Sequence, residues 1–124
     1  MQYIEHDEQA ALIRWWAGVC ESYGLSEKHL FAIPNGGQRN RIVASRLKDE
    51  GVRAGVPDLF LAVPINNFSG LFIEMKKPKG GRVTDVQKEY SALLNKAGYK
   101  AIVACGFQAA QDEITDYLAG AEIA

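Results

Sequence analysis

The sequence has few cysteines, no long apolar run and no excess of positive charge. Its 124 residues include only Cys20 and Cys105, which are too few for a disulfide framework or a cysteine-rich zinc site, so we expect two buried free thiols. No stretch reaches the roughly 18 apolar residues that cross a bilayer, and the N-terminus is acidic where a signal peptide is basic. We therefore expect an intracellular, cytoplasmic protein without a membrane partner.

Motifs of enzymes that act on small molecules are also missing. The chain contains neither a glycine-rich nucleotide fingerprint nor a nucleophile motif, so we expect no organic cofactor. A composition of 48% hydrophobic and 23% charged residues suits one compact domain over residues 1–124.

The net charge of −1 hides an uneven distribution of charged residues. Residues 38–53 carry a charge of +3 and residues 76–88 carry +4, which leaves −8 for the remainder. If folding brings the two basic stretches together, they form a face that attracts phosphate. The alternative is that each stretch is a solvated helix face or loop.

Residues 55–76 have the pattern of a β-hairpin. Two short apolar runs, Val56 to Val63 and Leu71 to Met75, flank turn-forming residues 66–70. Side chains alternate along a strand, so Glu74 and Lys76 share one face, and Asp58 lies near the start of the partner strand. Two neighbouring carboxylates repel each other unless a cation lies between them. Oxygen ligands of this kind suit Mg²⁺ or Mn²⁺.

Apolar periodicity predicts further helices and strands around this hairpin. The order is helix, strand, helix, the two hairpin strands, helix, strand and helix, which favours an α/β fold with a mixed central sheet flanked by helices. We expect Asp7 to cap the first helix and Cys105 to follow a buried strand. The predicted helices are 7–23, 38–50, 84–96 and 108–118, and the additional strands are 30–34 and 99–104.

Several residues have two competing interpretations. Glu8 is either a first-turn glutamate favoured by the helix dipole or a carboxylate directed toward the hairpin. Gln87 follows Thr84 by three residues, so a capping box competes with a role in a site. The turn at 34–37 is an ordinary connection or a place where phosphate approaches. Trp15, adjacent to Trp16, lies on its own domain or forms an interface with a second copy.

A family resemblance rests on three of these segments. Pro57-Asp58 followed by Glu74-Met75-Lys76 resembles the PD-(D/E)xK nuclease signature. Gly55 to Leu59, together with Gln87-x-x-Tyr90, resembles the VRR-NUC branch of that superfamily, of the small stand-alone viral or bacterial type. The resemblance spans most of the chain and implies a restriction-endonuclease-like core.

The resemblance also implies a site and a reaction. Asp58, Glu74, the backbone carbonyl of Met75 and Glu8 would hold one or two Mg²⁺ or Mn²⁺ ions. Lys76 would polarise water or stabilise the transition state, and Gln87 would position water or phosphate. The expected DNA contacts are Asn35, Gly36, Gly37, Arg39, Arg41, Arg53, Lys77, Lys79 and Arg82.

By the same resemblance, we expect a metal-dependent, structure-selective DNA endonuclease that acts as a Holliday-junction resolvase-like homodimer on branched DNA. One alternative is a nuclease for flaps or other branched DNA. Another is a DNA-binding or assembly module with a vestigial nuclease site, against which the intact Asp58, Glu74 and Lys76 argue.

Overall fold

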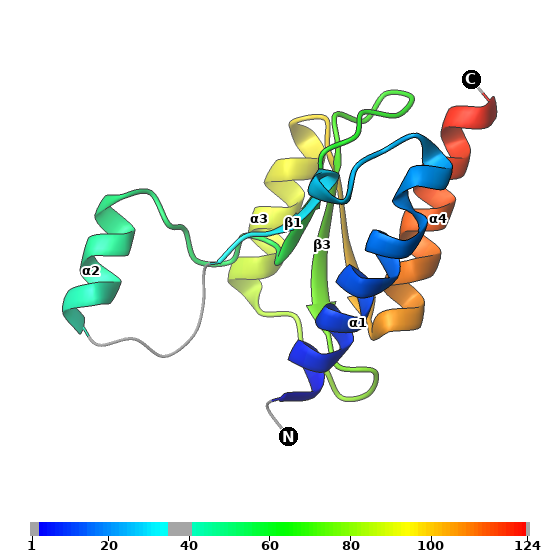
Figure 1. Ribbon diagram of the computed structural model, residues 1–124. Coiled ribbons are helices and arrows are strands. Elements are labelled where there is room, and N and C mark those ends of the chain that lie inside the picture. The colour runs from blue at the N-terminus through cyan, green and yellow to red at the C-terminus, as the bar shows by residue number, and fades with distance from the viewer. Residues whose placement is uncertain (1–2, 35–40, 124) are drawn as a thin grey trace.

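The computed structural model describes residues 3–34 and 41–123, which form a four-stranded mixed sheet with helices on both faces (Figure 1). The strands lie in the order β1, β2, β3, β4. The pairs β1–β2 and β2–β3 are antiparallel, whereas β3 and β4 are parallel. The strand bounds are Leu30–Ala32 for β1, Leu59–Leu61 for β2, Leu71–Lys76 for β3 and Lys100–Cys105 for β4.

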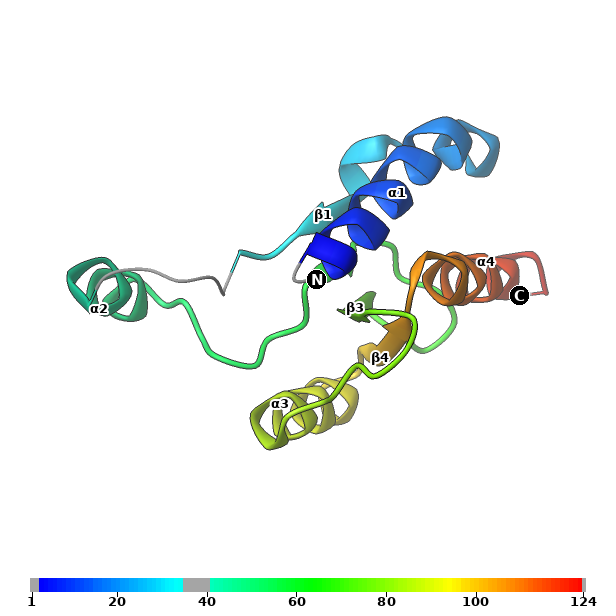
Figure 2. The ribbon, with the colours of Figure 1, turned by 90° about the horizontal axis from the view of Figure 1, so that it is seen from below.

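The helices divide between the two faces of the sheet. Helices α1 (Tyr3–Val19) and α4 (Phe107–Ile123) cover one face, and α3 (Asp85–Lys96) lies on the other, where it connects the parallel strands β3 and β4 (Figure 2). Short 3₁₀ turns, η1 (Cys20–Tyr23) and η2 (Glu27–His29), lead from α1 into β1. The core lies between the sheet and the pair α1 and α4. Its most buried side chains include Leu12, Trp16, Leu59, Leu61, Leu71, Ile73, Met75 and Ile114.

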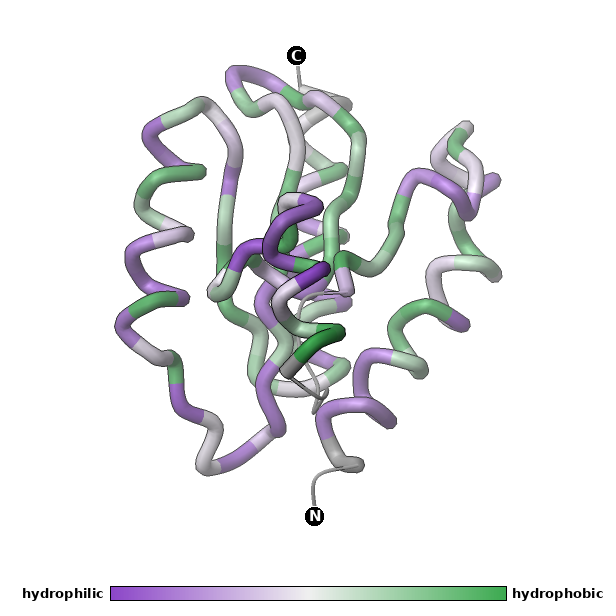
Figure 3. The backbone as a smooth tube through the Cα atoms, turned by 90° about the vertical axis from the view of Figure 1, so that its left-hand side faces the viewer, coloured by the Kyte–Doolittle hydropathy of each residue, from purple (hydrophilic) through white to green (hydrophobic). Residues whose placement is uncertain are grey.

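Helix α2 (Arg41–Asp49) stands away from this body (Figure 1). It carries both hydrophilic and hydrophobic residues (Figure 3). Ile42, near its start, has 67% of its surface exposed. Residues 50–58, which include turns at 50–51 and 54–55, connect α2 to β2. None of the described side chains of α2 is among the buried core residues.

The predicted α/β class, the hairpin and the order of the elements are confirmed, and three details differ. Helix α1 begins at Tyr3, so Asp7 lies inside it and is not its N-cap. Strand β4 is an edge strand, and Cys105 is a free but exposed thiol because it pairs with Lys76 at the end of the sheet. Val86 and Leu93 are largely exposed, so the apolar residues that predicted the helix at 84–96 are not all buried.

Candidate active site

The pairing of β2 with β3 brings the two hairpin carboxylates together. Leu59 stands opposite Ile73, so the preceding residue, Asp58, stands beside Glu74 on the face away from the core. Asp58 Oδ2 also accepts a hydrogen bond of 2.7 Å from the backbone N–H of Met75. This bond holds the Asp58 carboxylate against β3.

The same register explains a role for the proline before Asp58. Continuing the β2–β3 pairing places Pro57 opposite Met75. Opposite residues of an antiparallel pair exchange N–H···O bonds, but proline has no N–H to donate. The Met75 N–H bonds to the side chain of Asp58 instead, and its carbonyl points to the same side of the strand. The Pro-Asp sequence therefore leaves this carbonyl without a backbone donor from the opposite residue.

Glu74 is a buried carboxyl group with an incomplete set of partners. Only 3% of its surface is exposed, and its Oε1 atom is buried without a hydrogen-bond partner among the described residues. The pKa of Glu74 is raised to about 8, chiefly by burial and next by the neighbouring Asp58 carboxylate, while Lys76 acts in the opposite direction. The ionised form of Glu74 therefore needs more positive charge than Lys76 supplies.

Gln87 both caps α3 and contacts Glu74. Its Oε1 accepts a bond of 3.0 Å from the Thr84 N–H, while Thr84 Oγ1 accepts from the Gln87 N–H at 3.2 Å, which completes the capping box of α3. Its Nε2 donates to Glu74 Oε2 at 2.9 Å. The amide oxygen of Gln87 therefore caps α3, and its amide nitrogen bonds to the Glu74 carboxylate. The second bond holds α3 against β3 at the site.

Lys76 extends from the end of β3 toward the same carboxylate. Its Nζ lies 3.7 Å from Glu74 Oε2, and the side chain is 9% exposed. Gly81 of the following loop lies against it, because a Cβ at position 81 would come within 2.7 Å of the Lys76 Cβ. The glycine allows the loop to close over the lysine and keep it from solvent.

The two glutamates of α1 occupy different surroundings. Glu8 Oε1 accepts a bond of 2.8 Å from the Phe107 N–H at the start of α4. Gly106 gives it room, since a Cβ there would lie 2.9 Å from Glu8 Oε1. Glu5, one turn earlier, adds its charge to the effects that raise the pKa of Glu74. Sequence reasoning missed Glu5, and the metal-ligand role of Glu8 remains a prediction.

The donor set fits a hard divalent cation. Within the described chain, no group of three His, Cys, Asp or Glu side chains is already gathered closely enough to hold an ion. Asp58 and Glu74 nevertheless adjoin, the buried Glu74 Oε1 lacks a partner among the described residues, and the Met75 N–H bonds to Asp58, so the Met75 carbonyl lies on the β2 side of β3. These are oxygen donors of the type that Mg²⁺ and Mn²⁺ prefer.

The expected DNA contacts are only partly placed. Asn35, Gly36, Gly37 and Arg39 lie outside the described residues, as does the side chain of Arg41. Lys77, Lys79 and Arg82 lie on the loop that directly continues β3 beyond Lys76. Arg53 lies on the segment between α2 and β2. The second basic stretch therefore adjoins the carboxylates, whereas α2 carries much of the first stretch away from the body (Figure 1).

Trp15 is half-buried against the core of its own domain, and its ring centroid lies 6.3 Å from that of Trp16. Trp15 therefore lies on its own domain, which is the first of its two interpretations.

None of the helices in residues 3–34 and 41–123 combines the length and apolar character needed to cross a bilayer.

Comparison with known proteins agrees with this geometry. A solved structure described as a "VRR_NUC domain protein" superposes with a TM-score of 0.82 and 28% sequence identity, covering 94% of this chain and 89% of that one. No curated protein gives a significant match. The model of the VRR-NUC domain matches residues 4–108, which include Asp58, Glu74, Lys76 and Gln87. The chain therefore belongs to the VRR-NUC domain family, and its fold is that of a nuclease domain.

Proposed function

We propose that the chain is a divalent-metal-dependent DNA endonuclease. The observation that carries this proposal is the buried Glu74 Oε1, which lacks a partner and adjoins Asp58. A bound cation satisfies that oxygen and offsets the repulsion between the two carboxylates. Family membership supplies the reaction class, since VRR-NUC domains are nuclease domains.

The ligands in this proposal are Asp58, Glu74 and the Met75 carbonyl, with Mg²⁺ or Mn²⁺ as one or two ions. A carboxylate of α1 completes the set. Glu8 is the residue that the family resemblance indicated, but its Oε1 already caps α4, and Glu5 is its competitor. When bound, the metal lowers the pKa of a coordinated water and offsets negative charge on the scissile phosphate.

In this proposal Lys76 and Gln87 orient and stabilise the reacting groups. Lys76 places a buried ammonium group beside Glu74, where it can hold the attacking water or stabilise charge that develops on the phosphate. Gln87 fixes the Glu74 carboxylate through its Nε2 and is itself fixed by the capping box, so we assign it a positioning role. Phosphodiester hydrolysis that leaves 5′-phosphate and 3′-hydroxyl ends follows from the family resemblance.

In this proposal the basic loop after β3, residues 77–82, binds the DNA backbone. Lys79 and Arg82 are exposed there, and Lys77 is half-buried. They lie immediately beyond the metal ligands, so phosphates that they attract are close to the carboxylates. Arg53, Arg41, Arg39 and the turn at 35–37 are further proposed contacts.

We further propose that two copies act together on branched DNA, in the manner of a Holliday-junction resolvase. A pair of copies can read a symmetric branch. Helix α2 supports this proposal, because it stands away from the body and exposes Ile42. Cleavage of flaps or other branched DNA is the second candidate.

A panel of labelled DNAs tests the proposal. Duplex, single-stranded, flap and four-way-junction substrates are incubated with Mg²⁺, Mn²⁺ or EDTA. We expect cleavage only with metal, and a loss of several orders of magnitude in Asp58→Ala. The matched control is Asp116→Ala, which removes an exposed carboxylate of α4. Undiminished cleavage by Asp58→Ala refutes the site, and binding without cleavage under every condition favours a vestigial module.

A further inference from the structure

A cavity adjoins the carboxylate site on the same side of the sheet. Its volume is about 340 Å³, and it lies between the end of β1, helix α3 and the segment that leads from α2 to β2. This volume is within the range of sites that bind small organic molecules. Its lining includes Ile33, Glu50, Val52, Arg53, Val56 and Tyr90.

Chain connections place this cavity next to the reacting groups. Tyr90 follows Gln87 by one turn of α3, and Gln87 bonds to Glu74. Val56 precedes Asp58 by only two residues in the chain. A nucleotide that occupies the cavity therefore lies near the phosphate at the carboxylates.

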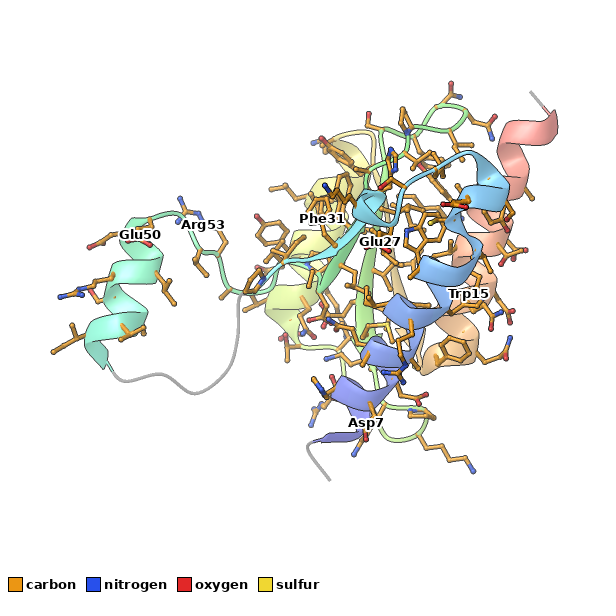
Figure 4. All side chains as sticks on the ribbon, viewed as in Figure 1. Asp7, Trp15, Glu27, Phe31, Glu50 and Arg53 are labelled. Atoms are coloured by element: carbon orange, nitrogen blue, oxygen red, sulfur yellow. The ribbon has the colours of Figure 1, made fainter. Side chains whose placement is uncertain are left out.

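The lining combines three kinds of contact. Tyr90 is a half-buried aromatic residue, and Ile33, Val52 and Val56 add apolar surface. Arg53 contributes a guanidinium group at the rim, where its Nη1 donates to the Lys48 carbonyl at 3.5 Å. Arg53 lies on the segment between α2 and the body (Figure 4). Glu50 contributes a carboxylate that can accept hydrogen bonds.

These contacts match a nucleobase better than a phosphate group. A base has flat π faces for Tyr90 and the apolar walls, and its edge carries both acceptors for Arg53 and amino donors for Glu50. A phosphate uses neither the ring nor the apolar walls, and the Glu50 carboxylate repels it. The chemistry of the lining therefore selects the base of a nucleotide.

We propose that this cavity binds one unpaired nucleobase of the DNA substrate, beside the phosphate that is cut. This inference rests on the proposed nuclease function and specifies its substrate. A base already unpaired at a branch, bulge or gap enters at little cost, whereas a base in a continuous duplex must first be unstacked and unpaired. The cavity thereby gives a single copy of the domain a preference for interrupted duplexes.

Binding measurements in EDTA test this proposal without cleavage. The probe is a duplex with one unpaired 2-aminopurine, compared with a fully paired duplex of the same length. We expect the wild-type protein to prefer the first probe and to quench its fluorescence by stacking. Tyr90→Leu should lower that preference about tenfold, because base stacking on an aromatic ring is lost. Tyr90→Phe should keep it, and the control Leu93→Ala, at an exposed position of α3, should change nothing.

The proposal is overturned by equal affinity of the wild-type protein for both probes, and equally by the same loss of affinity for both probes in Tyr90→Leu. A change in sedimentation of Tyr90→Leu without a change in DNA preference also overturns it, because the cavity then serves contacts between copies. Metal-dependent cleavage is measured separately. Cleavage without a preference for unpaired bases refutes the cavity alone, and preference without cleavage in any metal refutes the nuclease function alone.

Discussion

The Glu74→Gln substitution should remove a pH dependence from the stability of the metal-free protein. The pKa of Glu74 is about 8 in the folded protein, against an ordinary value of 4.5. Folding therefore favours protonated Glu74. This contribution to stability is fully present below pH 4.5 and is lost as the pH rises through 8. Glutamine has the same shape and stays neutral, so the variant lacks this loss.

The size of the effect follows from the two pKa values. Between pH 5.5 and 8.5, the wild-type protein should lose about 3 kcal/mol of unfolding free energy that Glu74→Gln keeps. For a domain of this length, that corresponds to a difference in Tm of roughly 10 °C. Calorimetry or thermal-shift scans in EDTA at the two pH values measure it. All other titrating groups are common to both proteins, so the comparison isolates Glu74.

Addition of Mg²⁺ or Mn²⁺ should reverse the trend in the wild-type protein only. Metal binds the ionised carboxylate, so its stabilising effect grows with pH and each binding event releases protons. Asp116→Asn, which changes an exposed carboxylate, serves as the control and should behave like the wild type. Parallel pH profiles of wild type and Glu74→Gln in EDTA would refute the reasoning, since Glu74 would then be ionised in the folded protein without cost.

Three further predictions concern α1, the basic loop and the oligomer. Glu5→Ala should weaken metal binding measured by calorimetry, whereas Glu8→Ala should cost about 1–2 kcal/mol of stability by uncapping the Phe107 N–H; the opposite pattern would make Glu8 the ligand. Lys79→Ala should weaken DNA binding and reduce the slope of log affinity against log salt by about one, and an unchanged slope would show a merely solvated charge. Sedimentation at micromolar concentration should give a dimer whose dissociation by Ile42→Lys abolishes cutting of four-way junctions, and a strict monomer would contradict the resolvase proposal.

The hairpin part of the site could be predicted from sequence because local rules govern it. The two-residue period of a strand places Glu74 and Lys76 on one face, and the β2–β3 pairing adds Asp58 to that face. The capping box of Gln87 was also visible, because it depends on residues three apart. Its second bond, to Glu74, depends on where α3 crosses the sheet.

The carboxylates of α1 show a feature of the site that local sequence patterns do not predict. Glu5 and Glu8 are both in the first part of one helix, and nothing in that segment decides which of them faces the hairpin. The bond from the Phe107 N–H to Glu8, at the start of α4, depends on a residue far away in the chain. The position of α2 away from the body and the exposure of Cys105 likewise depend on how the helices cover the sheet.

The bond between Glu8 and Phe107 joins residues 99 positions apart in the chain, and this separation has a consequence for folding. A chain that emerges from the ribosome makes α1 first, and its capping partner appears only after β4 has been synthesised. The parallel strands β3 and β4 are likewise a non-local pairing that forms slowly. Because α1, β2, β3 and α3 all contribute to the carboxylate site, a partly synthesised chain has no assembled site. The carboxylate cluster is therefore complete only after α3 has docked on the sheet through the bond from Gln87 to Glu74.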